Sequence, residues 1–322
     1  MKKIVSFFTL ICNHLFEFIR FIRFSNMIYL NSPDKLRGKI IFRYHSIEKG
    51  LINKPIRHNF GSYKIIRLLD YLHLWVNNNY SLNDTQFLSA CKVLETYWDL
   101  HVKAGINIED IISIAEYNFI IKYSKQGIGG TISLTSEEYF INSKSPFDDF
   151  SESRHSIRHF NGALIETKII EEVIKLARNA PSVCNRQGFR VKLINNSDLV
   201  QQTLKVQSGL NATAKSVRQI LIVSIDRGVF VSSSECYQAF IDGGIFLQNL
   251  LYSLHFHMIA AVPLNWSKHF IDDIKLEKIL NLPKSEKVIA LVAIGYPVDN
   301  FKVPISRRKN IDEIFKIINK LK

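Results

Sequence analysis

The sequence predicts an α+β fold, with a mixed central sheet flanked by helices and a helical extension in front of it. Two observations support this prediction. Apolar residues recur at helical spacing through residues 60–145, where no strand alternation occurs. Beyond residue 150, short apolar runs at 189–194, 219–225 and 287–294 alternate with helical stretches. We therefore divide the 322-residue chain into an N-terminal helical extension, 1–145, and an α+β domain, 146–322.

The extension contains several helical stretches. Apolar positions at 65–72, 87–98 and 108–123 fit one helix face each. Thr135 followed by Glu138 predicts a capping box in front of a further short helix. The Gly-rich run GIGG at 127–130 follows no strand, so we interpret it as a loop.

The first 24 residues are rich in Phe, Ile and Leu but are interrupted by polar and charged residues. The uninterrupted apolar run is too short to span a bilayer, and no small-residue cleavage site follows it. An amphipathic helix is therefore predicted. It would either pack on the domain or lie on a membrane surface.

Charge and cysteine usage limit the classes of partner. The net charge of +13 suggests an anionic partner, and residues 1–60 hold eleven Lys or Arg against three Asp or Glu. No nucleic-acid motif accompanies the charge, so we expect no nucleic-acid partner. The four cysteines form no CxxC pair and no His cluster, which predicts neither a metal site nor a disulfide framework. Reduced thiols favour a cytoplasmic protein, with membrane contact through the basic N-terminus as the peripheral alternative.

The α+β domain contains a long helix from about Glu235 to Phe256. Gly243 and Gly244 lie inside it and predict a close approach of another backbone or a ligand, since each costs about 1 kcal/mol relative to Ala. Its apolar residues exceed what one small sheet face covers. Either a second subunit or the N-terminal helices of the same chain would bury them.

Short polar segments follow one another in a fixed order along this domain. Arg154, with Arg158 four residues later, can grip an oxyanion through planar donors, although a solvated basic turn has the same composition. The segment APSVCNRQ at 180–187 offers polar groups between a helix and a strand. AVPLNW at 261–266 is expected to form an apolar turn, and SRRK at 306–309 is a second basic cluster.

Several common catalytic motifs are absent from the sequence. It has no GxxxxGK[ST], no HExxH and no GxSxG, and no Rossmann fingerprint for a nicotinamide bound in that manner. The absence of a triad-like set of side chains agrees with chemistry carried by a cofactor.

Taken together and in order, these segments resemble the FMN-dependent nitroreductases over about residues 150–310. The resemblance implies a homodimer with flavin-mediated chemistry and no catalytic side chain. Hydride would pass from NAD(P)H through FMN to an electron-poor small-molecule acceptor by a ping-pong mechanism. It implies FMN-phosphate contacts from Arg154, His155, Ser156 and Arg158, and from Arg307 and Arg308. It implies contacts to the flavin ring from Pro181, Ser182, Val183 and Asn185. In this family such contacts are often made to the flavin of the other subunit. Pro263, Leu264 and Asn265 would face the ring, with the Asn265 amide directed at N5, and Asn211 is a further candidate.

The chain departs from the family pattern at Gly188-Phe189, where Pro-Trp is common, and at Trp266, where Gly is common. The segment HSIEKGL at 45–51 resembles an extension in nitroreductase-like proteins associated with bacterial surface-polysaccharide synthesis. An alternative function is a non-catalytic flavin-binding or scaffold subunit of a membrane-associated biosynthetic assembly, which the basic N-terminus and the unusual Gly188 and Trp266 would suit.

Overall fold

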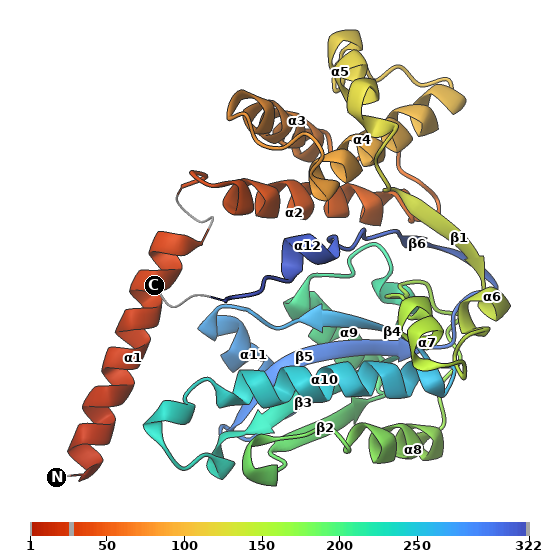
Figure 1. Cartoon of the computed structure of the whole chain (residues 1–322). Coiled ribbons are helices and arrows are strands. Elements are labelled where there is room, and N and C mark those ends of the chain that lie inside the picture. The colour runs from red at the N-terminus through yellow and green to blue at the C-terminus, as the bar shows by residue number, and fades with distance from the viewer. Residues whose placement is uncertain (1, 26–28, 320–322) are drawn as a thin grey trace. The chain divides into compact units, whose positions relative to one another are not determined.

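The computed structural model describes residues 2–25 and 29–319 (Figure 1). The chain forms two compact units. The α+β unit consists of Met1–Leu15 and Leu134–Phe301, and the helical unit of Phe16–Ser133 and Lys302–Lys322. These two units are defined by how the residues pack. The boundary at 145/146 was predicted from the expected function of each part, so it stays a prediction.

The helical unit is built from amphipathic helices around one apolar core. Ser32 caps its first long helix by accepting a hydrogen bond from the Lys35 amide, and Asp84 caps another by accepting from the Gln86 and Phe87 amides. Trp75 and Tyr97 are fully buried between these helices. The helices are α2 (Pro33–Leu51), α3 (Ser62–Asn77), α4 (Thr85–Lys103), α5 (Ile114–Ser124) and α12 (Ile311–Ile314).

The HSIEKGL segment lies at the end of α2 and holds the Gly-rich loop in place. Glu48 is buried, its carboxylate accepts a hydrogen bond from the Gly130 amide at 3.2 Å, and its other oxygen lies 3.1 Å from His45 Nδ1. The prediction that 127–130 is a loop is confirmed. The C-terminal segment belongs to the same unit, since Thr85 donates to Glu313 at 2.8 Å and the Ile305 amide donates to the Gly130 carbonyl.

The α+β unit is organised on a four-stranded sheet in the order β2-β3-β5-β4. All three pairings are antiparallel, where the sequence analysis expected a mixed sheet. The predicted strands at 189–194, 219–225 and 287–294 are confirmed to within one residue. The strands are β2 (Phe189–Ile194), β3 (Gln219–Asp226), β4 (Ala260–Asn265) and β5 (Glu286–Gly295).

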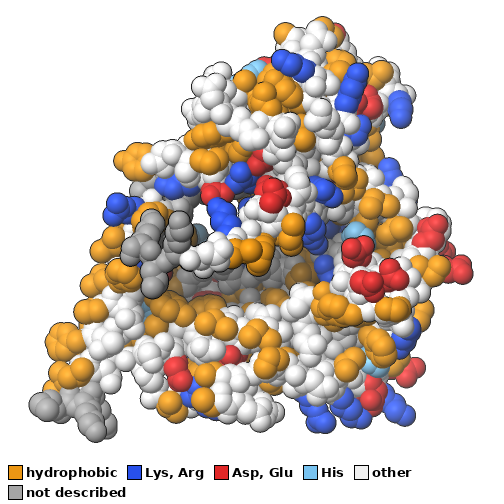
Figure 2. Space-filling model, viewed as in Figure 1, with side chains coloured by type: hydrophobic (Ala, Val, Ile, Leu, Met, Phe, Trp, Pro, Cys, Tyr) orange, Lys and Arg blue, Asp and Glu red, His pale blue; other side chains and the backbone are white. Residues whose placement is uncertain are grey.

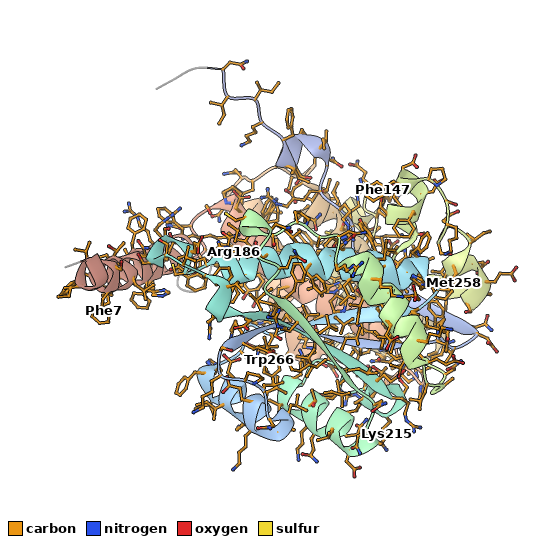
Figure 3. The ribbon with its side chains drawn as sticks, turned by 90° about the horizontal axis from the view of Figure 1, so that it is seen from below. Phe7, Phe147, Arg186, Lys215, Met258 and Trp266 are labelled. Atoms are coloured by element: carbon orange, nitrogen blue, oxygen red, sulfur yellow. The ribbon has the colours of Figure 1, made fainter. Side chains whose placement is uncertain are left out.

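Helices cover both faces of this sheet (Figure 3). α10 packs on the strands together with α8, and α9 packs with α11 over the opposite face. The short helices α6 and α7 precede them, and the Thr135–Glu138 capping box is confirmed at the start of α6. The helices are α6 (Ser136–Phe140), α7 (Phe147–Ser153), α8 (Thr167–Ala177), α9 (Ser197–Gln207), α10 (Gln238–Phe256) and α11 (Phe270–Leu280).

The burial of α10 corrects one expectation. Its residues Phe246, Leu250, Leu251 and Leu254 pack within the chain against α8 and the sheet, so they need no second subunit and no N-terminal helix to cover them. A different stripe of α10 stays exposed, formed by Phe240, Ile241 and Ile245 at 51%, 53% and 40%. α10 therefore exposes apolar surface to solvent, but on the side opposite to the four buried residues.

Besides β4, which was expected to be a turn, two strands were not predicted from the sequence. β1 (Thr131–Thr135) and β6 (Asn300–Pro304) pair in a two-stranded sheet, and the boundary between the units falls inside both strands. β1 lies in the region expected to be helical. Its five residues are too few to reveal an alternating pattern beside the longer helices.

The N-terminal helix α1 (Lys2–Phe24) also differs from expectation. It is continuous, and Ile4–Phe24 is long and apolar enough to cross a membrane by length and composition. None of that stretch is buried, so its apolar residues are not covered by packing on the domain among the described residues.

Candidate functional site

The loop between α8 and β2 has an unusual backbone. Cys184, Asn185 and Gln187 adopt positive φ angles of 46°, 55° and 48°, a conformation that non-glycine residues adopt rarely. Such conformations persist only where surrounding contacts impose them, and they cluster at ligand sites. Pro181 and Asn185 are exposed, and Ser182 and Val183 are half-buried. The loop therefore presents polar groups at the surface in a fixed conformation.

Contacts from α10 and from within the loop impose this conformation. The Val183 amide donates to both carboxylate oxygens of Asp242, at 3.3 Å each, and Asp242 is itself 2% exposed. The Gln187 amide donates to Ser182 Oγ at 2.9 Å. Asp242 is a functional candidate that the sequence analysis missed, and only its place beside Gly243 could have indicated it.

Arg186 joins the loop to the segment that precedes α10 (Figure 3). Its guanidinium donates to both carboxylate oxygens of Glu235, at 2.6 and 3.1 Å, and to the Val229 carbonyl at 3.0 Å. The Arg186 hydrogen bonds and a further bond from the Val231 amide lower the pKa of Glu235 to about 2. The pair therefore stays ionised over the neutral range and ties two surface segments together.

The basic segment after α7 runs in extended conformation beside strand β4. The Ile157 amide donates to the Ala261 carbonyl at 3.0 Å, and the Tyr139 hydroxyl donates to the His155 carbonyl at 3.0 Å. Arg154, His155, Ser156 and Arg158 are half-buried, while Ile157 is inserted into the core. Two guanidinium groups and a hydroxyl thus lie within five residues of one another, a donor set that suits a phosphate.

The charge of this segment acts on a buried histidine of α10. His255 is 1% exposed, and its Nε2 lies 2.8 Å from Ser153 Oγ. Burial first, and then the positive charges of Arg154 and His155, lower the pKa of His255 to about 4. His255 is therefore neutral at pH 7 and adds no charge to the basic segment.

The AVPLNW segment is a strand and not the expected turn. Ala260–Asn265 pairs with β5, from Ala260 opposite Gly295 to Asn265 opposite Ala290. Pro263 is accommodated because β4 is the outer strand of the sheet, where a missing amide leaves no ladder bond unmade. The Leu264 side chain is buried, whereas Asn265 is exposed and its carbonyl accepts from Gln207 at 3.2 Å. Only Asn265 of this segment presents its side chain to solvent.

Trp266, which departs from the family pattern, lies in the core and not at the surface. It is 3% exposed, and its indole donates to Asp273 on α11 at 2.5 Å. Its role is to pack the end of β4 against α11 (Figure 3). The departure from the family pattern at this position is explained by core packing.

The register of the sheet separates the two groups of predicted flavin contacts. β2 and β4 are the outer strands, three strand spacings apart, which is about 14 Å. The first residue of β2 pairs with Ile225, so β2 begins at the end of the sheet where β4 ends. The Ile157 amide, in contrast, bonds to β4 near the first residue of β4, at the other end of the sheet. The loop at 181–187 and the basic segment therefore lie on the order of 20 Å apart. Pro263 and Asn265 share a strand with Ala261 and lie nearer to the basic segment.

The remaining candidates lie elsewhere. Asn211 is exposed in a turn after α9. Arg307 and Arg308 belong to the helical unit, where Arg307 donates to Asn310 at 3.2 Å and Arg308 donates to the Ser306 carbonyl at 3.1 Å. Their assignment to the phosphate stays a prediction.

Comparison with known proteins locates a family segment inside the α+β unit. Residues 152–243 match the model of the nitroreductase family, which confirms the predicted nitroreductase-like fold. Iodotyrosine deiodinase of Haliscomenobacter hydrossis is 21% identical over 206 residues, which are 54% of this chain and 89% of that protein.

Solved structures are similar at low identity. A nitroreductase family protein from Streptococcus pneumoniae is 18% identical with a TM-score of 0.46, over 54% of this chain and all of that one. A protein from Desulfovibrio desulfuricans, solved in complex with FMN, is 19% identical with a TM-score of 0.46, over 55% of this chain and 99% of that one.

Proposed function

We propose that this protein is an FMN-dependent oxidoreductase that takes hydride from NAD(P)H and reduces an electron-poor small molecule. The supporting observation is that one family segment, 152–243, contains both the basic segment and the strained loop. When bound, FMN would supply the redox chemistry, which explains why no protein nucleophile is needed.

The residues present fit the phosphate of FMN. We assign Arg154, Ser156 and Arg158 to it, with His155 beside them, because forked guanidinium donors match phosphate oxygens and a hydroxyl adds a further donor. Because His255 is neutral, it adds no further buried positive charge beside the basic segment. Arg307 and Arg308 are proposed as additional phosphate contacts.

Pro263, Leu264 and Asn265 are proposed to line the ring from β4, with the Asn265 amide as a donor. Asn211 is proposed as a further flavin contact on the basis of the resemblance. The second group of ring contacts is Pro181, Ser182, Val183 and Asn185, held by Asp242 and Arg186. These contacts exclude water from one side of the ring and orient the acceptor.

We further propose a homodimer in which each ring is contacted by the partner's strained loop. Within one chain, the loop and the basic segment are on the order of 20 Å apart. This separation supports assigning the two groups of contacts to two different flavins. The exposed stripe of Phe240, Ile241 and Ile245 on α10 supplies the interface, because it continues from Asp242, which holds the loop.

The dimer proposal is tested by replacing an exposed isoleucine of α10 by a charged residue. Ile241→Glu should lower dimer content and flavin content together, measured by light scattering coupled to flavin absorbance. Ile274→Glu is the matched control, since Ile274 is 56% exposed on α11, over the other face of the sheet. A monomeric Ile241→Glu variant that retains its full FMN would place the site within a single chain.

The physiological setting is proposed from the sequence resemblance alone. A cytoplasmic reaction in surface-polysaccharide synthesis suits the HSIEKGL segment on α2. The alternative, a non-catalytic flavin-binding or scaffold subunit, is favoured by the exposed α1 helix. NAD(P)H consumption with a generic quinone or nitroaromatic acceptor separates the two.

A further inference from the structure

Helix α1 carries an apolar surface that no described residue covers. Eleven large apolar side chains between Ile4 and Phe24 are 40–63% exposed, and none of this stretch is buried. Phe7 lies on the outer side of the helix (Figure 3), and hydrophobic side chains follow the visible face of α1 (Figure 2). Soluble proteins rarely expose a continuous patch of this extent without a partner for it.

Five polar residues of α1 form one narrow stripe. Ser6, Thr9, Asn13, Glu17 and Arg20 recur at spacings of three or four, so they share one side of the helix. Glu17 and Arg20 pair along this stripe at 2.9 Å. The remaining sides, which are the greater part of the circumference, carry mostly Phe, Ile, Leu and Val, with His14 next to the stripe and Cys12 and Arg23 among the apolar residues.

Tyr237 contacts α1 beside this polar stripe. The Tyr237 hydroxyl lies 3.2 Å from His14 Nδ1 and 3.5 Å from the Asn13 carbonyl, and its ring packs edge-on against His14 at 5.5 Å. A helix that packs on a soluble domain turns its apolar side inward. In α1 the contact is made beside the polar stripe, through His14 and the Asn13 carbonyl, so the apolar side around Phe8 and Leu15 is directed away from it.

We propose that α1 lies in the plane of an anionic membrane surface and anchors the protein there. The apolar sides would enter the boundary between headgroups and acyl chains, and the polar stripe would stay at the headgroups. Arg20 and Arg23 are exposed and match the negative charge of such a surface. The apolar surface is too broad for a coiled-coil seam with a second copy, which needs only a narrow stripe.

The polar stripe also decides between lying on the membrane and crossing it. A helix that crossed would bring Glu17 and Arg20 into the hydrocarbon, where each charged residue is costly. An in-plane helix leaves both at the water boundary, where their ion pair stays solvated. The length of α1 alone would permit a span, but its charges favour the interface.

The test is flotation of the full-length protein with vesicles of phosphatidylcholine, with and without phosphatidylglycerol. The parent should float with the anionic vesicles and less with the neutral ones. Phe8→Glu with Leu15→Glu, in the middle of the apolar side, should lower the bound fraction by about tenfold or more, since apolar burial drives insertion. Ser6→Glu with Thr9→Glu is the matched control, with the same added charge in the polar stripe, and should bind within about twofold of the parent.

Several outcomes would overturn the proposal. The parent could stay unbound with both vesicle types, or the control could lose as much binding as the apolar variant, which would leave electrostatics alone. Self-association of the parent that Phe8→Glu with Leu15→Glu abolishes, without vesicle binding, would assign α1 to a second copy. Bound protein is quantified by protein mass and not by flavin, so failure of the proposed oxidoreductase activity would be seen separately. Far-ultraviolet circular dichroism confirms that each variant is folded.

Discussion

Two adjacent glycines of α10 provide a matched pair for testing the packing of the sheet. A Cβ added at Gly243 would lie 2.5 and 2.8 Å from Ile289 Cγ1 and Cδ1 on β5, and 3.2 Å from Ile225 Cγ1 on β3. A Cβ added at Gly244 would meet nothing within 4 Å. Both residues lie in the helix interior, where Ala is favoured over Gly by about 1 kcal/mol.

The two substitutions should therefore have opposite effects. Gly244→Ala should raise the free energy of unfolding by about 1 kcal/mol. Gly243→Ala should lose this gain and more, because overpacking a core costs about 1–3 kcal/mol. The two variants should differ by about 1–3 kcal/mol on the same basis. Urea unfolding followed by circular dichroism gives the difference from the two midpoints. A Gly243→Ala variant as stable as Gly244→Ala would show that α10 does not approach β3 and β5 as described.

Three further predictions concern the site. Arg154→Ala should weaken FMN binding by about ten- to a hundredfold, because a charge-assisted hydrogen bond contributes roughly 1.5–3 kcal/mol; titration with FMN and with riboflavin checks this, and equal losses for both ligands would remove Arg154 from the phosphate. Asp242→Ala should leave the half-buried Val183 amide without its acceptor and loosen the loop, seen as faster amide exchange at 182–187; unchanged exchange would contradict the role of Asp242. The pKa of His255 is lowered from 6.5 to about 4, so its contribution to stability is present above pH 6.5 and is lost as the pH falls toward 4; His255→Gln should flatten the stability profile in this window, and an unchanged profile would refute the assignment.

The sequence predicted the regular parts of the α+β unit well. Strands at 189–194 and 219–225 are uniform apolar runs between turn residues, and the structure places them at those positions. β4 was mistaken for a turn because Pro263 interrupts its apolar run. A proline is tolerated in an outer strand, and position in the sheet order cannot be seen in the local sequence.

Contacts between residues far apart in the chain are the second feature that could not be predicted from the sequence. Asp242 holds the Val183 amide across 59 residues, and Arg186 reaches Glu235 across 49. Neither pair has a local signature. The sequence correctly indicated that α10 carries a large apolar surface. Which side of α10 the sheet covers depends on the register of four strands, so it could not be predicted. For α1 the pattern predicted an amphipathic helix, and only the structure shows that His14, beside its polar stripe, contacts Tyr237.

The proposed function is tested most directly by the absorption spectrum of the purified full-length protein, before and after NAD(P)H is added under nitrogen. The proposal predicts a yellow protein with the spectrum of a bound flavin, released as FMN on denaturation and bleached by NAD(P)H. It also predicts that the colour returns when a quinone or nitroaromatic acceptor is added. A colourless protein that does not take up added FMN would contradict the assignment of Arg154, Ser156 and Arg158 to a flavin phosphate. A yellow protein that NAD(P)H leaves unbleached would contradict the oxidoreductase and favour the flavin-binding scaffold.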